Sequence, residues 1–183
     1  AHGQVQGLVP KEKLPTYNIF YEGRTFARGT PGMAAKHVPP LGGTPVPLGD
    51  LVFALDFGTM ALEVCEDVWS ADGPMRRRCY SGAELVVNVS ASPFRVGVDA
   101  TRREMLATRS SDHQCTLAYT NLVGANDGLI FDGGGRVFQN GKPMLDAPRF
   151  KEGWAACTVD LNRTSRLRTE NTTWRDDREV WER

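Results

Sequence analysis

The sequence lacks several features that would point at once to a function class. Its 22 Lys and Arg residues equal its 22 Asp and Glu residues, so the formal net charge is zero. Domains that bind nucleic acid by neutralising phosphates are usually strongly basic, and the balance argues against that class. The apolar runs are only as long as strands, which argues against a membrane span. We find no internal repeat and no low-complexity segment.

Cysteine and histidine are also sparse. No C-x-x-C pair of the kind used for zinc or redox chemistry occurs among the four cysteines, which are Cys65, Cys79, Cys115 and Cys157. A chain of this size does not need disulfides, so we expect a reducing, cytoplasmic compartment and structural roles for the last three cysteines. His37 and His113 have no partner at metal-ligand spacing, and the sequence therefore predicts no metal site.

Strands alternate with helices along the chain, and some strands come in hairpins. Branched and aromatic residues predict strands at 51–57, 59–64, 85–89, 116–123, 129–131, 136–138 and 154–161. Gly58, residues 132–135 and Asn140–Gly141 are expected to be hairpin turns. Helices are predicted at 75–82 and 99–111, the second with Asp99 or Thr101 as its N-cap. This order is typical of a mixed α/β protein whose sheets are covered by helices on their outer faces.

Three further segments are interpreted as peripheral. The proline- and glycine-rich stretch 29–49 is expected to be a long covering loop. The three arginines at 76–78 are expected on a solvated helix face, since a neutral chain gives little support to an anion site. The charged residues 168–183 indicate a polar tail, linker or peripheral helix, which leaves 1–167 as the domain.

Cys65 ends an apolar strand and is followed by two acids, in the stretch LEVCEDVW from Leu62 to Trp69. Burial as an inert thiol is the commoner fate of a free cysteine. A nucleophilic cysteine needs activation by a cation, a base or a helix N-terminus. A strand-to-helix elbow would supply the last of these and would aim the backbone N–H of Glu66 at a developing oxyanion. Position alone leaves both interpretations open.

A second stretch runs from Lys11 to Phe26 and reads KEKLPTYNIFYEGRTF. A lysine held by Leu14 and Pro15 would present a fixed ammonium to a pocket, although lysine usually belongs in water. Aromatic and charged residues alternate after it, which is unusual for a solvated face. The pattern favours a wall whose polar groups point at a ligand.

Together the two stretches resemble the nitrilase, or carbon–nitrogen hydrolase, superfamily, and within it the glutaminase domain of glutamine-dependent NAD synthetases. The shared motifs are K-x-x-L-P-x-Y, F-x-E-x-R-x-F, C-E-D-x-W and the string NVSASP at 88–93. The resemblance runs from Gly7 to about Asn162. It implies an α-β-β-α sandwich, here incomplete at the N-terminus, with two sheets packed face to face. It also implies self-association into a homo-oligomer.

The resemblance assigns roles to individual residues. Cys65 would be the nucleophile, Lys11 the catalytic lysine, and the N–H of Glu66 an oxyanion donor. The residues expected to contact glutamine are Tyr17, Glu22, Ser92 and, with less support, Trp69. A carboxylate such as Glu22 suits the α-ammonium group of that substrate.

The implied reaction is hydrolysis of the glutamine side-chain amide through a thioester on Cys65. The ammonia would pass to a synthetase domain that uses ATP to amidate deamido-NAD, and no cofactor is expected in the segment itself. The family's general-base glutamate lies well upstream of the lysine, yet none of the ten residues before Lys11 is acidic. We therefore expect a partial domain of a longer parent chain, inactive alone.

Two alternatives stay open on the sequence. A free-standing nitrilase-family amidase acting on another small amide would share the fold and the cysteine–lysine pair, although the segment 17–26 favours the synthetase. A catalytically dead module kept for assembly would explain the missing glutamate, but the intact pair counts against it.

Overall fold

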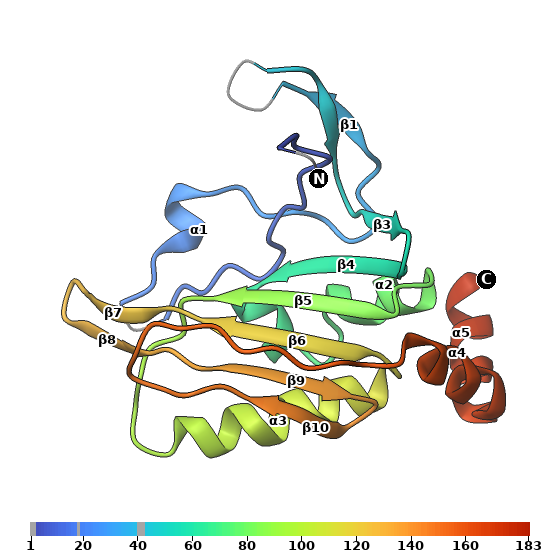
Figure 1. Ribbon diagram of the computed structural model, residues 1–183. Coiled ribbons are helices and arrows are strands. Elements are labelled where there is room, and N and C mark those ends of the chain that lie inside the picture. Colours follow the sequence, from blue (N-terminus) through green and yellow to red (C-terminus); the bar gives the residue numbers. More distant parts are fainter. Residues whose placement is uncertain (1–2, 18, 40–42) are drawn as a thin grey trace.

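A mixed six-stranded sheet forms the centre of the molecule. The computed structural model describes residues 3–17, 19–39 and 43–183 (Figure 1). The strands lie in the order β10-β9-β6-β5-β4-β3, with β4, β5 and β6 parallel and the other neighbours antiparallel. Their bounds are Val52–Leu55 (β3), Gly58–Val64 (β4), Leu85–Ser90 (β5), Thr116–Asn121 (β6), Gly135–Gln139 (β9) and Lys142–Asp146 (β10). The predicted hairpins at Gly58 and at Asn140–Gly141 are both confirmed.

Two small antiparallel hairpins stand apart from this sheet. β1 (Lys36–Val38) pairs with β2 (Val46–Leu48), and β7 (Val123–Asn126) pairs with β8 (Leu129–Asp132). The first hairpin lies inside the segment predicted as a long loop, of which residues 40–42 fall outside the described part of the chain. The second projects beyond the end of the main sheet (Figure 1).

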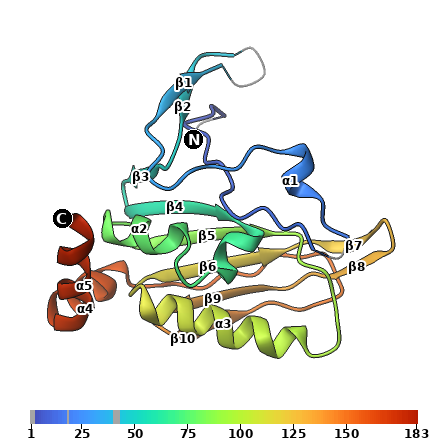
Figure 2. The same cartoon turned by 180° about the vertical axis from the view of Figure 1, so that it is seen from behind.

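Some of the helical segments cover one face of the sheet, and the core lies between these helices and the sheet (Figure 2). The helical segments are α1 (Glu22–Thr25), η2 (Cys65–Trp69), α2 (Pro74–Tyr80), α3 (Val98–Asp112), α4 (Leu161–Glu170) and α5 (Thr172–Glu182). Strand alternation puts Ala61, Val86 and Leu117 on the side of α2 and α3 (Figure 2), where Leu106 of α3 is buried with them. Burial of Val86, Leu117 and Leu106 contributes ~1.5–3 kcal/mol for each side chain.

The opposite face of the sheet is apolar and largely uncovered. Val87, Ala118 and Val137 line a hollow of about 890 Å³ there, together with Trp154. The chain after β10 crosses this face in an extended path (Figure 1). The mixed α/β class is thus confirmed, and the described residues form one six-stranded sheet with a helical layer, beside two short hairpins.

The predicted pairing of 129–131 with 136–138 is wrong. β8 pairs with β7, whereas β9 joins the main sheet between β6 and β10. Gly133 and Gly134, with φ of 64° and 85°, turn the chain between them. Such positive φ values cost glycine little, so the turn redirects the chain to another sheet and does not close a hairpin.

The strand predicted at 154–161 is also absent. The segment lies across the sheet face and not along a strand edge, so its backbone has no ladder to join; Trp154 is 90% exposed. Cys157 is exposed too, which contradicts its expected structural role, while Cys79 and Cys115 are buried in the core. Gly97, with φ of 82°, begins α3 in place of the predicted cap at Asp99 or Thr101.

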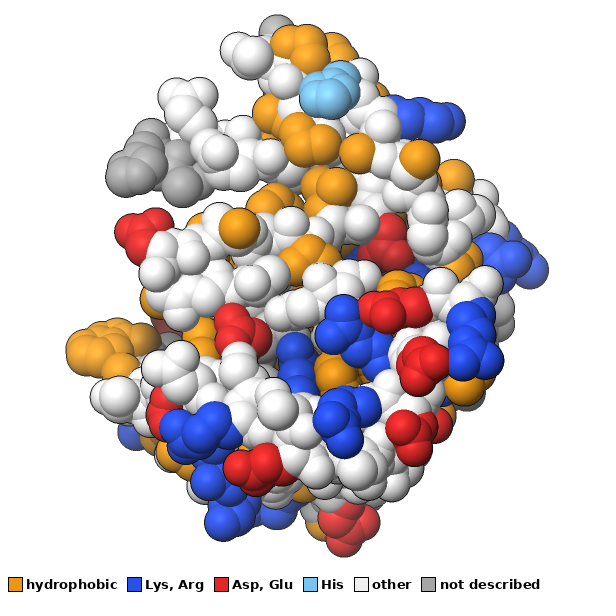
Figure 3. Space-filling view, turned by 90° about the vertical axis from the view of Figure 1, so that its right-hand side faces the viewer, with side chains coloured by type: hydrophobic (Ala, Val, Ile, Leu, Met, Phe, Trp, Pro, Cys, Tyr) orange, Lys and Arg blue, Asp and Glu red, His pale blue; other side chains and the backbone are white. Residues whose placement is uncertain are grey.

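The polar residues 168–183 are mostly helical and dock onto the domain. Arg168 donates to the backbone oxygens of Ala83 (2.6 Å) and Gln114 (2.9 Å), and its guanidinium lies over the Trp174 ring. Basic and acidic side chains intermingle on the end of the molecule that Figure 3 shows. α4 runs through the domain boundary expected at residue 167. None of the described helices has the length and hydropathy that a membrane span requires.

Candidate active site

The candidate nucleophile lies at a strained turn. Cys65 follows β4 directly and opens the short helix η2, as the expected strand-to-helix elbow requires. Its φ is +48°, a conformation that non-glycine residues adopt rarely and at a cost of order 1–3 kcal/mol. Strain of this kind persists where the surrounding structure fixes a side chain for a purpose.

The electrostatic setting of Cys65 leaves its thiol protonated at rest. Burial raises the pKa of the thiol above its ordinary value. The Lys11 ammonium, the Ser90 hydroxyl and the N–H of Ala91 act in the opposite direction and lower this pKa, but they do not outweigh burial. A nucleophile with a raised pKa needs a base to accept its proton before it attacks.

Lys11 lies close enough to influence this thiol and is held by a carboxylate. Its Nζ donates to Oε2 of Glu22, at the start of α1, over 2.6 Å. Their side chains are 15% and 27% exposed, so the pair is partly shielded from water. The structure brings Lys11 and Cys65 together as expected. One oxygen of the Glu22 carboxylate is already bonded to the lysine.

Tyr17 and Glu66 meet at the rim of the same site. The Tyr17 hydroxyl donates to Oε2 of Glu66 over 2.9 Å, and the Tyr17 ring makes an edge contact with Phe20. Partial burial, followed by the hydrogen bond to Glu66, raises the pKa of Tyr17 to about 12. The phenol is therefore a permanent donor near neutral pH. The oxyanion role expected of the Glu66 N–H stays a prediction.

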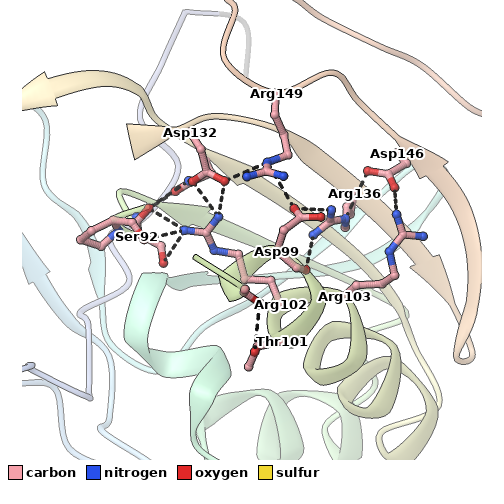
Figure 4. Close-up of polar contacts among 12 residues, drawn as sticks. Ser92, Asp99, Thr101, Arg102, Arg103, Asp132, Arg136, Asp146 and Arg149 are labelled. Atoms are coloured by element: carbon pink, nitrogen blue, oxygen red, sulfur yellow. Dashed lines mark hydrogen bonds and ion pairs between the residues drawn. The ribbon is translucent and has the colours of Figure 1, made fainter. Parts of the chain in front are cut away.

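Ser92 is buried in a hydrogen-bonded loop after β5. Its Oγ and its backbone oxygen both accept from Nη2 of Arg102, at 3.1 and 2.8 Å, and its N–H donates to Asn121. Arg102 of α3 also donates to both oxygens of Asp132, at 2.7 and 2.8 Å (Figure 4). The sequence signal that could have found this pair is the spacing of Arg102, four residues after Val98 and four before Leu106, on the apolar side of the helix.

Trp69 lies at the end of η2 and packs against the hydrophobic core. Its backbone oxygen accepts from Nη2 of Arg109 at 3.2 Å. These contacts give the ring a packing role, and lining of the substrate pocket by Trp69 stays a prediction.

Two of the three arginines of α2 are shielded from solvent, against the prediction, whereas Arg76 is 39% exposed and pairs with the exposed Asp72. Arg78 is only 2% exposed and donates to Asp50 over 2.8 Å and to the backbone oxygen of Leu62. Arg77 donates to Asp50 as well, over 2.9 and 3.0 Å, and to the carboxylate of Glu12. The prediction failed because these two carboxylates, far away in sequence, fold against the helix and pair with its cations.

Sequence reasoning also missed a buried polar chain beneath the nucleophile. Nδ2 of Asn88 donates to Oε1 of Glu63 (3.2 Å) and to the backbone oxygen of Cys65 (3.4 Å), and the Ser90 hydroxyl donates to Oδ1 of Asn88 (2.7 Å). Burial, followed by the charge of Asp67, raises the pKa of Glu63 to about 8. Glu63 is 1% exposed, so it cannot reach a substrate as a general base.

The described ranges contain no group of three or more His, Cys, Asp or Glu side chains arranged to hold a metal ion.

Comparison with known proteins identifies relatives of this arrangement. The chain is 34% identical over 175 residues to a glutamine-dependent NAD(+) synthetase of Aquifex aeolicus, covering 95% of this chain and 28% of that protein. It is 34% identical over 177 residues to the protein of the same name in Mycobacterium tuberculosis, covering 92% and 25%. The chain thus spans about a quarter of the curated relatives it matches. No family model matches the chain.

Solved structures agree with these relatives. A glutamine-dependent NAD(+) synthetase from Cytophaga hutchinsonii superposes with a TM-score of 0.69 and 27% identity over 80% of this chain and 23% of that one. The NitN amidase from Neterenkonia sp. AN1 gives 0.56 and 26%, over 76% and 47%. A carbon–nitrogen hydrolase from Helicobacter pylori, 22% identical with a TM-score of 0.72, shares the fold over 93% of this chain and 57% of its own. The chain is therefore related to part of the glutamine-dependent NAD(+) synthetases, and it has the fold of the carbon–nitrogen hydrolases.

Proposed function

We propose that this chain is the glutamine-hydrolysing part of a glutamine-dependent NAD synthetase. The observation that carries the proposal is the meeting of Cys65, at a strained elbow, with the Lys11–Glu22 ion pair. The relatives named above support the same proposal, since their name states a dependence on glutamine.

In the proposed reaction Cys65 Sγ attacks the side-chain amide carbon of glutamine. The thiol proton goes to a base, and the Lys11 ammonium with the N–H of Glu66 stabilises the oxyanion of the tetrahedral intermediate. Collapse of this intermediate breaks the carbon–nitrogen bond, ammonia leaves with the transferred proton, and a thioester remains. Water then attacks the thioester and releases glutamate. Since Glu63 is inaccessible, we assign the base to a residue outside this segment.

The side chains around the thiol suit the ends of a glutamine molecule. The Tyr17 hydroxyl, whose proton goes to Glu66, presents its oxygen as an acceptor, and the second oxygen of the Glu22 carboxylate suits an ammonium. Ser92 shapes the opposite wall through a loop that Arg102 holds in place. Trp69 would close the pocket from the end of η2.

The remaining steps belong to the longer parent chain. Its synthetase domain would take up the ammonia and use ATP to amidate deamido-NAD, in the cytoplasm. Nitrilase-type domains self-associate through helical faces, and we expect a homo-oligomer here as well.

The test is glutamine hydrolysis by the complete parent chain. Glutamate release should be lost in Cys65→Ala and should fall by ~10²–10³-fold in Lys11→Met, because one oxyanion donor contributes about that much. Thr108→Ala, an exposed change on α3, serves as the matched control. A folded parent chain that releases no glutamate would contradict the proposal and favour a catalytically inactive assembly module.

A second candidate is an amidase acting on another small amide, favoured by the likeness to the NitN amidase. The same assay separates the two. Faster release of ammonia from acetamide or propionamide than from glutamine would replace the glutaminase assignment, whereas a preference for glutamine supports it.

A further inference from the structure

A buried carboxylate joins the two segments that carry the candidate catalytic groups. Asp67 is 1% exposed, and its Oδ1 accepts from the backbone N–H of Glu12 (3.1 Å) and of Lys13 (2.8 Å). Its Oδ2 accepts from the backbone N–H of Val64 over 3.1 Å. Glu12 and Lys13 follow the candidate lysine directly, and Val64 precedes the candidate nucleophile. One side chain thus spans both segments.

The contacts of Asp67 are backbone contacts, so they fix main-chain positions. Hydrogen bonds from N–H groups to a carboxylate are roughly twice as strong as neutral ones, and buried N–H groups left unpaired cost about 1–3 kcal/mol each. The residues joined, Glu12 and Val64, lie far apart in sequence, so the relative position of their segments depends on tertiary contacts such as these.

We propose that Asp67 is a positioning residue that sets the distance between the Lys11 ammonium and the Cys65 thiol. The inference rests on the proposed function only in taking these two groups as the reacting pair. Through this distance Asp67 controls how strongly the ammonium favours the thiolate and the oxyanion that follows it.

Other tethers would keep the Lys11 segment attached when Asp67 is replaced. The Glu12 carboxylate pairs with Arg77, the Lys11 ammonium with Glu22, and the Lys11 backbone oxygen accepts from the N–H of Gly29 over 2.8 Å. The segment should therefore shift by a fraction of an ångström to about one ångström without detaching. Misplacement of that size can reduce a rate by ~10²-fold.

The charged and titratable groups that face the thiol come from three elements. Lys11 and Tyr17 belong to the N-terminal segment, Glu66 to η2, and Tyr119 to β6. Of these groups, only Lys11 is a cation. A change in the pKa of Cys65 that disappears when Lys11 is replaced therefore reports on the distance between the Lys11 ammonium and the thiol.

The experiment measures the pH dependence of Cys65 alkylation by iodoacetamide in the complete parent chain, read from the mass of the Cys65 peptide. Cys157 is exposed and is replaced by serine in every variant to remove competing reaction. Asp67→Asn keeps one hydrogen-bond acceptor, which can serve either the Glu12–Lys13 backbone or the Val64 backbone but not both. Asp67→Ala keeps no acceptor. Ser110→Ala, which loses the hydrogen bond from a buried hydroxyl to the Cys115 backbone oxygen, is the matched control for general destabilisation.

We expect both Asp67 variants to raise the apparent pKa of Cys65, as Lys11→Met does, and not to raise it when made in the Lys11→Met background. Glutamine turnover should lose kcat by ~10²-fold with little change in KM. The proposal is overturned if folded Asp67→Asn keeps the wild-type thiol pKa, or if Asp67 variants raise it equally without Lys11. A parent chain that alkylates as expected but hydrolyses no glutamine would defeat the proposed function and leave the positioning role standing.

Discussion

Glu63 is a carboxyl group in surroundings that disfavour its charge. Burial and the neighbouring Asp67 raise its pKa from an ordinary 4.5 to about 8, despite the hydrogen bond from Asn88. The folded protein therefore retains a proton that the unfolded chain loses. Stability from this group is fully present below about pH 4.5 and is lost progressively as the pH rises to about 8.

Glu63→Gln should remove this pH dependence, because the amide mimics the protonated carboxyl and keeps the contact with Asn88. We expect the Tm of the variant, relative to the wild type, to rise steadily between pH 5 and pH 8. Thermal unfolding of both proteins across this range checks it. A Tm difference that does not change with pH would show that Glu63 is already ionised in the folded state.

Arg102 and Asp132 form a buried ion pair, and its loss should lower both the stability of the fold and the affinity for glutamine. Arg102→Met leaves Asp132, which is 0% exposed, without its main cation and should cost ~3–5 kcal/mol of unfolding free energy. It also releases the backbone oxygens of Ser92 and Pro93, so KM for glutamine should rise. Urea unfolding and kinetics measure both effects. The double variant Arg102→Met with Asp132→Asn should regain part of the stability, and failure to do so would mean that the pair is not the source.

At the scale of elements, α3 and the docked C-terminal helices each bury their own apolar side chains. Leu106→Ala on α3 opens a cavity at a fully buried position and should cost ~2–5 kcal/mol in urea unfolding. The exposed substitution Thr108→Ala, two residues on, should cost well under 1 kcal/mol. Equal costs for the two would contradict the packing described for this helix.

Trp174 tests whether α5 belongs to the folded domain. The ring is 5% exposed, meets Tyr80 edge-on at 5.3 Å and lies under the Arg168 guanidinium. Trp174→Ala should therefore cost ~3–5 kcal/mol, whereas Arg175→Ala on the exposed side of the same helix should be nearly neutral. An unchanged unfolding curve for Trp174→Ala would make residues 168–183 a detached linker, as one sequence-based interpretation had it.

The sequence predicted the elements whose signal is local and missed those set by distant partners. β4, β5 and α3 carry their own periodicity, and the cysteine elbow follows from a strand that ends in CED. Tertiary neighbours that no window of sequence contains decide which strands β9 pairs with, where residues 154–161 run and why Arg78 is buried. The same holds for Asp67 and Asn88, which read as ordinary polar residues until the segments that they join are seen together.

At the scale of the whole molecule, the described helices cover only one of the two faces of the sheet. Val87, Ala118 and Val137 on the open face are half-buried, and they form an apolar surface together with Trp154, which is 90% exposed. Residues 1–183 produced alone should therefore bind a dye that fluoresces on apolar surfaces, and the complete parent chain should not. Equal dye binding by both would show that the open face stays uncovered in the longer protein.

The central claim is that Cys65 is the nucleophile of a glutamine amidohydrolase, and mass spectrometry of the acyl-enzyme tests it most directly. The complete parent chain is mixed with glutamine, quenched in acid within one turnover and digested. A glutamyl thioester on the Cys65 peptide, absent from Cys65→Ala and reduced in Lys11→Met, is the predicted result. Full glutaminase activity in Cys65→Ala, or an adduct on another cysteine, would contradict the account.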